Sequence, residues 1–144
     1  MAVPEYLRGE GIFDVTLKAR ELAAYTIRVC ANPRIFKPEL NTSITNNIVH
    51  LAVTIFLLCF EANEVNVRKN QTPEKLCKHV NARLDYQEEA YQKTEDLLAL
   101  IHLASPIFHL KSKRIKYWGT LITDTQSMIY GWNISDRKRF SEYL

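Results

Sequence analysis

Four histidines, three cysteines and two pairs of adjacent carboxylates are the side chains of this sequence that could carry out chemistry. A di-iron centre in a helical bundle needs Glu-x-x-His on two helices, and no glutamate here has a histidine three residues later. Metal ligands on one helix recur at short, regular spacings, and the four histidines do not. The pair formed by Cys77 and His79 alone is a weak signal. The sequence therefore predicts no metal site, with exposed or core positions for His50, His79, His102 and His109.

The carboxylate pairs Glu88-Glu89 and Glu95-Asp96, with Lys93 between them, are typical of a solvated helix face. The sequence has no Gly-rich phosphate loop, no Gly-x-Ser-x-Gly elbow and no Cys-x-x-Cys pair. We therefore expect that the protein is not an enzyme and that it uses no cofactor.

The cysteines Cys30, Cys59 and Cys77 are odd in number and lie in apolar or helical stretches. This pattern predicts reduced thiols that pack in a cytosolic protein. The first residues, MAVPEYLRGEG, contain no apolar segment of the secretory-signal type. We therefore expect a cytoplasmic location.

Positive charge is concentrated in three short segments, although the formal net charge is only +3. Clustered cations attract phosphate backbones, because each neutralised phosphate releases counterions. The segments predict surfaces for nucleic acid or for a protein partner; the alternative is that they only keep the protein soluble. The residues are Lys111, Lys113, Arg114 and Lys116, then Arg68 and Lys69, then Arg137, Lys138 and Arg139.

These groups must be positioned by helices, because apolar residues recur at helical spacing and glycine and proline are scarce. We predict helices at about 14–32, 43–64, 73–104 and 113–130, followed by a basic tail at 131–144. Asp14 is the expected N-cap of the first helix, and Thr72 followed by Pro73 predicts the start of the third. The fold class is all-α: an up-down-up-down four-helix bundle formed by residues 1–144 as one domain.

Each predicted helix has an apolar stripe. The stripe of the first helix is Val15, Ala19, Leu22, Thr26 and Val29, and that of the second is Ile48, Leu51, Ile55, Leu58 and Ala62. The third helix has two heptad positions, one with Cys77, Leu84, Tyr91 and Leu98 and the other with Val80, Gln87, Thr94 and Ile101. The stripe of the fourth helix is Ile115, Trp118, Ile122, Thr125, Ile129 and Trp132. We also expect Ser112 to cap the fourth helix.

The segment IVHLAVTIFLLCF, residues 48–60, is more apolar than one bundle helix requires. Its uninterrupted core is shorter than the roughly 20 residues of a membrane span, and Glu61 follows at once. At about 100° per residue its apolar arc covers roughly 220°, about twice what a surface helix needs. We predict a homo-oligomer interface on the second stripe, formed by Val49, Val53, Phe56 and Phe60; the alternative is a monomer in which loop 33–41 or the tail covers it.

Two long segments give the chain a family resemblance. NNIVHLAVTIFLLCFEAN, residues 46–63, ends in Glu61-Ala62-Asn63, and TEDLLALIHLASPIFHLKSKRIKYWGTLITDTQSMIYGW, residues 94–132, closes in Gly131-Trp132. In content and order they resemble the accessory variability determinant proteins of diversity-generating retroelements. The family often has an arginine where this chain has Thr45-Asn46-Asn47, so no individual contact residue is carried over.

The resemblance implies a homopentameric barrel of four-helix bundles without catalytic residues. Such proteins associate with the retroelement reverse transcriptase and its template RNA and support mutagenic reverse transcription. Two other interpretations stay open: the four-helix protein encoded within ribosomal RNA intervening sequences, and a purely structural or interaction bundle with no role in nucleic-acid binding.

Overall fold

The computed structural model describes residues 12–40 and 43–144, and the stretch MAVPEYLRGEG lies outside them. Four α-helices dominate the described residues: α1 (Ile12–Ala31), α2 (Ser43–Glu64), α3 (Pro73–Phe108) and α4 (Ser112–Arg139). Short 3-10 turns, η2 (Pro38–Leu40) and η3 (Ser141–Tyr143), follow α1 and α4, and these residues contain no strand. The all-α, four-helix prediction is confirmed.

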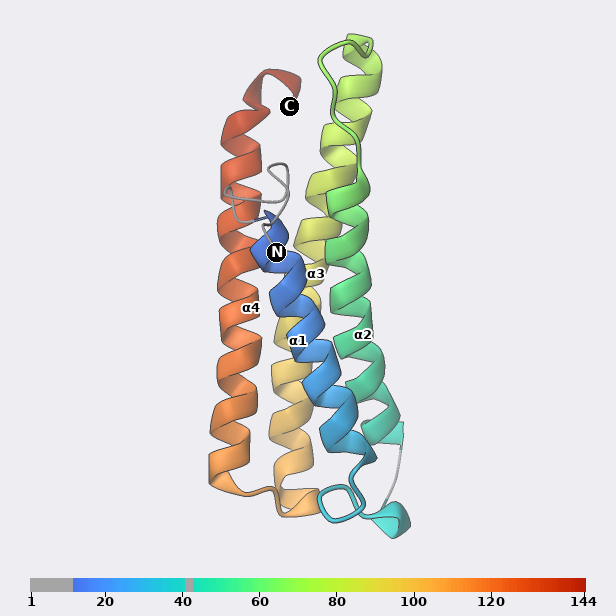
Figure 1. Cartoon of the computed structure of the whole chain (residues 1–144), viewed down its shortest axis with the longest axis vertical. Helices are drawn as coiled ribbons and strands as arrows, with labels where there is room; N and C mark the ends of the chain where they lie inside the picture. The colour runs from blue at the N-terminus through green and yellow to red at the C-terminus, as the bar shows by residue number, and fades with distance from the viewer. Residues whose placement is uncertain (1–11, 41–42) are drawn as a thin grey trace, which may run out of the picture.

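Consecutive helices run antiparallel and pack side by side, and α1 also packs on α4 (Figure 1). The α1–α2 and α3–α4 connections lie at one end of the bundle, and the α2–α3 connection and the C-terminus lie at the other (Figure 1). At this second end, α3 and α4 extend beyond α1, because they contain 36 and 28 residues against its 20 (Figure 1).

The core stripes of α1 and α4 follow the helical spacing of the sequence. The stripe of α1 is buried throughout as predicted, and the stripe of α4 is buried from Trp118 to Trp132, whereas Ile115 is only partly buried. Trp118 and Thr26 join the two helices, since the indole Nε1 donates to Thr26 Oγ1 over 3.0 Å and both side chains are buried. A buried indole N–H usually needs such a partner, and here the neighbouring helix supplies it.

One of the two heptad positions predicted for α3 is wrong at three of its four residues. Val80, Gln87, Thr94 and Ile101 are buried as predicted, and so is Leu84 of the other position. Cys77 is exposed, and Tyr91 and Leu98 are only partly buried. The second buried row is Leu76, Arg83, Ala90, Leu97 and Ala104.

The reason for the wrong register is Arg83, which occupies a core position although it is charged. Its Nε donates to Asp136 Oδ2 of α4 over 2.6 Å, and its Nη1 lies 3.4 Å from the carbonyl oxygen of Ala62. Gln87 Nε2 donates to the same Asp136 oxygen over 2.6 Å. A buried charge is tolerated where it is paired and hydrogen-bonded in this way, so hydrophobicity alone does not identify the position.

Two helices end later than predicted. The predicted end of α3 at 104 is wrong, because the helix continues through Pro106 to Phe108, whose buried ring packs on Phe36 at 4.6 Å between centroids. The predicted tail at 131–144 is wrong as well: α4 continues to Arg139, since Trp132 and Asp136 are buried core residues of its last turns. Gly131, the predicted terminator, is an exposed helical residue.

The predicted start of α3 is confirmed, and two others are wrong. Thr72 has an extended backbone and its hydroxyl accepts from Lys75 N over 3.3 Å, with Pro73 at the first helical position. In α1 the helical backbone already begins at Ile12, so Asp14 lies inside the helix and is not its N-cap. In α4 the N-cap is Lys111, which has an extended backbone, and Ser112 is the first helical residue.

Candidate nucleic-acid and partner interface

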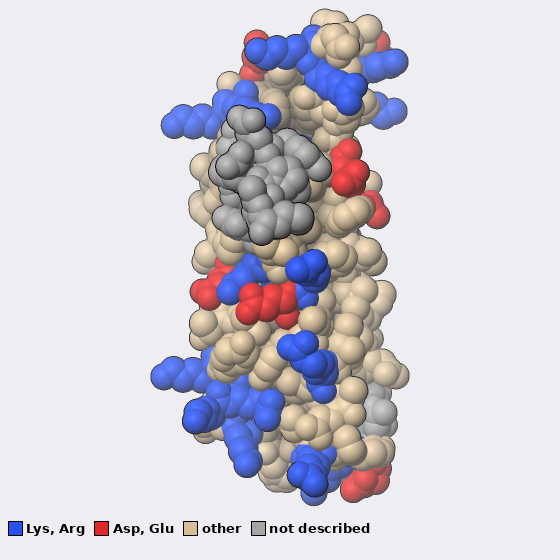
Figure 2. Space-filling view, in the orientation of Figure 1, with Lys and Arg blue, Asp and Glu red and all other residues tan. Residues whose placement is uncertain are grey.

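Lysine and arginine gather at both ends of the bundle, as Figure 2 shows for one face of the molecule. The α4-start cluster surrounds the beginning of α4 and contains Arg28, Arg34, Lys37, Lys111, Lys113, Arg114 and Lys116. The α4-end cluster lies at the opposite end and contains Arg68, Lys69, Lys75, Lys78, Arg137, Lys138 and Arg139. The structure thus places the predicted Lys111–Lys116 group apart from Arg68, Lys69 and Arg137–Arg139, and joins these last two groups at one end (Figure 1).

The α4-start cluster forms because two distant segments pack together at this end. Phe36, in the loop after α1, is buried against Phe108 and lies 6.1 Å from the ring of Trp118. This anchor brings Arg34 beside Lys111 and Arg114, and the three line a pocket of about 250 Å³. Within segments 28–40 and 109–116 the only acidic residue is Glu39, so the surface is strongly electropositive.

The helix start itself adds to this positive field. No side chain caps α4 at Lys111, whose carbonyl oxygen accepts from the backbone N–H of Arg114 and of Ile115, both over 3.0 Å. His109, just before the cap, has φ 52°, and its N–H donates to the carbonyl oxygen of Ser105 as α3 ends. The positive end of the α4 dipole therefore points out among the cations, an arrangement that favours an anionic partner.

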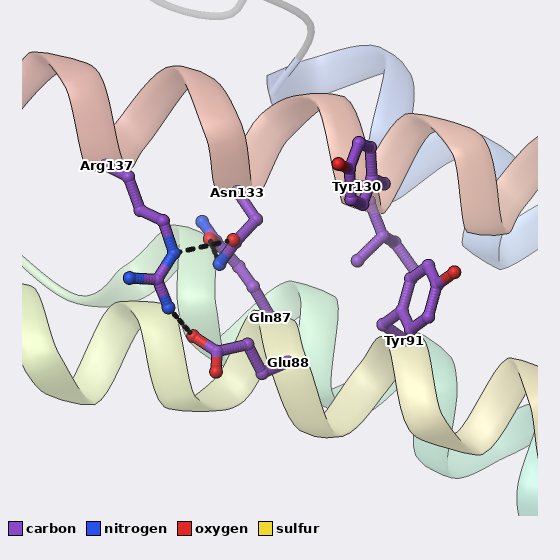
Figure 3. A pocket seen from close by; sticks show the side chains of 7 residues that line it. Gln87, Glu88, Tyr91, Tyr130, Asn133 and Arg137 are labelled. Carbon is purple, nitrogen blue, oxygen red and sulfur yellow. Dashed lines mark hydrogen bonds and ion pairs between the residues drawn. The ribbon is translucent and has the colours of Figure 1, made fainter.

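Three arginines of the α4-end cluster already interact with other side chains of the same chain. Arg137 forms an ion pair with Glu88, and its Nε donates to Asn133 Oδ1 over 3.0 Å (Figure 3). The guanidinium of Arg139 lies 4.7 Å from the ring centroid of Phe140, and Arg68 Nε donates to Asn66 Oδ1 over 3.0 Å. Because these side chains hold local structure, a phosphate must compete for them.

The concave surface next to Arg137 is lined mainly by apolar and neutral groups. Its volume is about 280 Å³, between the exposed faces of α3 and α4 (Figure 3). Tyr91 and Tyr130 lie at one end, with ring centroids 6.2 Å apart, and the Asn133 amide donates to Gln87 Oε1 over 3.0 Å at the other. Its two charged residues, Glu88 and Arg137, pair with each other.

The remaining residues considered for chemistry are scattered. Within residues 12–40 and 43–144, no group of three His, Cys, Asp or Glu side chains lies close enough to hold a metal ion. His79 Nδ1 lies 3.0 Å from the Asn66 carbonyl oxygen and 3.1 Å from Gln71 Oε1. His79 thus stabilises the α2–α3 loop by hydrogen bonding. His50, His102 and His109 are exposed.

The three cysteines are free thiols and differ in environment. Burial raises the pKa of Cys30 and that of Cys59 to about 12, so both thiols stay protonated near neutrality. Cys77 is exposed on α3, which corrects the prediction that all three cysteines pack inside the protein.

The second stripe of α2 is left incompletely covered by its own chain. Val49, Val53 and Phe56 are partly buried, and Phe60 is 45% exposed. The ring centroids of Phe56 and Phe60 lie 6.2 Å apart. By length and composition α2 could also cross a membrane, and only 33% of its most apolar window is buried inside the bundle. The core-facing row is Ile48, Ala52, Ile55, Cys59 and Ala62, all fully buried. The predicted stripe is therefore wrong at Leu51 and Leu58, which are only partly buried. α2 has a second, partly open apolar side.

Two tyrosines of this region were missed by the sequence reasoning. Tyr117 of α4 is 51% exposed, and Tyr25 of α1 packs against it at 4.9 Å between ring centroids. The available signal was the segment KSKRIKYWG, in which an aromatic residue directly follows the basic run. Arg28 and Arg34 were missed because each is isolated in the sequence. The packing of α1 on α4 brings Arg28 to the cluster, and the packing of Phe36 on Phe108 brings Arg34 to it.

Comparison of the chain with protein-family models, with curated proteins and with solved structures finds no significant match.

Proposed function

We propose that this protein is a non-catalytic, oligomeric accessory subunit of a diversity-generating retroelement, which binds the reverse transcriptase and the template RNA in the cytoplasm. The observation that carries the proposal is the α4-start cluster, where seven cations from two distant segments surround the exposed N-terminus of α4. A surface of this kind binds phosphate backbones. The resemblance of residues 46–63 and 94–132 to the accessory variability determinant proteins supports the choice of partner.

The homopentamer that the resemblance implies is part of the proposal. The partly open side of α2 supports self-association, because a partly exposed strip with two phenylalanines and two valines costs free energy in water. The occupant that fits is a neighbouring copy, and all the predicted interface residues lie on one helix. In a closed ring of five copies each contact joins two different surfaces, so the strip packs on another surface of the next copy.

Co-purification tests the partner directly. The tagged protein is co-expressed with the reverse transcriptase of a candidate retroelement and its template RNA, and the retained protein and RNA are measured after washes of rising salt concentration. We expect both to be retained, and RNA retention to fall steeply with salt. Loss of both already at low salt contradicts the proposal. A control pull-down with an unrelated RNA-binding polymerase separates specific from charge-driven association.

A further inference from the structure

An exposed aromatic ring, that of Tyr117, lies beside the α4-start cluster where α1 packs on α4. We call this contact region, formed by Tyr25 of α1 and Tyr117 of α4, the seam. Tyr117 is 51% exposed, and its inner side rests on Tyr25, whose ring is inclined to it at 62°. Tyr25 in turn lies 6.0 Å from the buried indole of Trp118, which is held by its hydrogen bond to Thr26. The Tyr117 ring is therefore supported from below by fixed neighbours while one side faces solvent.

Cations from two helices surround this ring. Arg114, one turn before Tyr117 on α4, places Nη1 3.4 Å from the hydroxyl of Tyr25, and Lys113 lies four residues before Tyr117 on the same helix face. Arg28 follows Tyr25 by three residues on α1 and is exposed. In Figure 2 basic side chains gather over this lower part of α4. The seam thus combines a free aromatic surface with positive charge on both of its helices.

We propose that this seam binds single-stranded RNA, with one unpaired base stacked on Tyr117 and the adjoining phosphates held by Lys113, Arg114 and Arg28. The inference rests on the proposed function and specifies the form of the RNA. An aromatic ring among cations suits a single strand, because the base faces of a duplex are already stacked on each other. A contact made by cations alone would treat duplex and single strand alike.

An oligonucleotide without bases isolates the stacking contact. The probes are a fluorescent oligoadenylate of about six nucleotides, within the site sizes of single-strand binders, and an abasic strand of equal length and charge. We expect Tyr117→Ala to weaken oligoadenylate binding roughly 5- to 100-fold and to leave abasic-strand binding unchanged. Tyr117→Phe keeps the ring and should bind as the wild type does.

The matched control is Tyr130→Ala, which removes a similarly exposed tyrosine from α4 at a distance from the α4-start cluster. It should leave binding of both probes unchanged, and the thermal unfolding midpoint of every variant checks that the bundle is intact. Equal weakening of both probes by Tyr117→Ala, or no weakening of either, overturns the stacking proposal. So does a Tyr117→Ala variant that loses only the reverse transcriptase, which would make the ring a protein contact.

A double variant, Lys113→Glu with Arg114→Glu, separates the stacking contact from the general affinity for RNA. If it abolishes binding of both probes while Tyr117→Ala has no effect, the seam proposal fails and the proposed RNA-binding function stands. If the wild-type protein binds neither probe nor the template RNA, both fail.

Discussion

Arg83 of α3 and Asp136 of α4 form a buried ion pair, with side chains only 7% and 2% exposed. The same guanidinium lies 5.3 Å from the ring centroid of Trp132 and 6.0 Å from that of Phe140. The pair thus fastens the last turns of α4 to α3 beyond the end of α1.

Asp136→Ala removes one charge and leaves Arg83 buried without its partner. We expect a loss of about 3–5 kcal/mol in the free energy of unfolding, since an uncompensated buried charge is strongly unfavourable. Chemical denaturation followed by circular dichroism measures it. The matched variant replaces both partners by apolar residues, Arg83→Met with Asp136→Leu, and should cost less than Asp136→Ala alone. A larger loss in the double variant would show that the pair is not the source of the effect.

Phe56→Glu places a charge in the second apolar stripe of α2. We expect the oligomer of this variant to dissociate into folded monomers, because burying a carboxylate between apolar surfaces without a partner is strongly unfavourable. Light scattering coupled to size exclusion gives the mass. Leu57→Glu is the control: Leu57 is 49% exposed on the same helix but is rotated by about 100° from Phe56. Wild-type protein that is already monomeric contradicts the interface assignment.

Charge reversal compares the two basic clusters. Lys113→Glu with Arg114→Glu should weaken RNA binding at least about tenfold and reduce the salt dependence, by a slope of about 0.7 for each lost phosphate contact to a single strand. Arg137→Glu with Arg139→Glu should have the smaller effect, because Arg137 already pairs with Glu88. Binding isotherms at several salt concentrations measure both. An equal or reversed order of effects contradicts the ranking of the clusters.

The cysteines should differ sharply in reactivity. At pH 8 we expect exposed Cys77 to react quickly with a thiol reagent, whereas Cys30 and Cys59, with pKa values of about 12, are thiolates to roughly one part in ten thousand. In the unfolded chain these two thiols ionise near their ordinary pKa of 9.0, so the free energy of unfolding should fall as the pH rises from about 9 to about 12. Mass spectrometry of timed labelling identifies the residues, and Cys77→Ser should abolish the fast phase.

Helical periodicity predicted the four helices and the core stripes of two of them, whereas in α3 it placed exposed Cys77 in the core. The stripe from Val15 to Val29 is buried as predicted, and so is that from Trp118 to Trp132. It failed at Arg83 and Asp136, because each is charged and only their pairing across two helices makes burial favourable. It also failed at Gly131, where local propensity indicates a helix end but the packing of Trp132 and Asp136 extends α4.

The candidate interface was only partly predictable for a similar reason. A run such as Lys111–Lys116 is visible in the sequence, whereas Arg28, Arg34 and Tyr25 join it through tertiary packing alone. The stripe of Val49, Val53, Phe56 and Phe60 could be derived from helix geometry, but its covering partner is a separate chain in our proposal and lies beyond what one sequence specifies.

The uninterrupted length of α4 determines how long a nucleic acid must be to reach both basic clusters. One helix carries Lys113 near its first turn and Arg139 at its last, and at 1.5 Å per residue the two lie roughly 40 Å apart. A continuous helix cannot shorten this separation. Strands too short to cover it touch a single cluster, and affinity should therefore increase in a step, not smoothly, once an oligonucleotide becomes long enough to reach both.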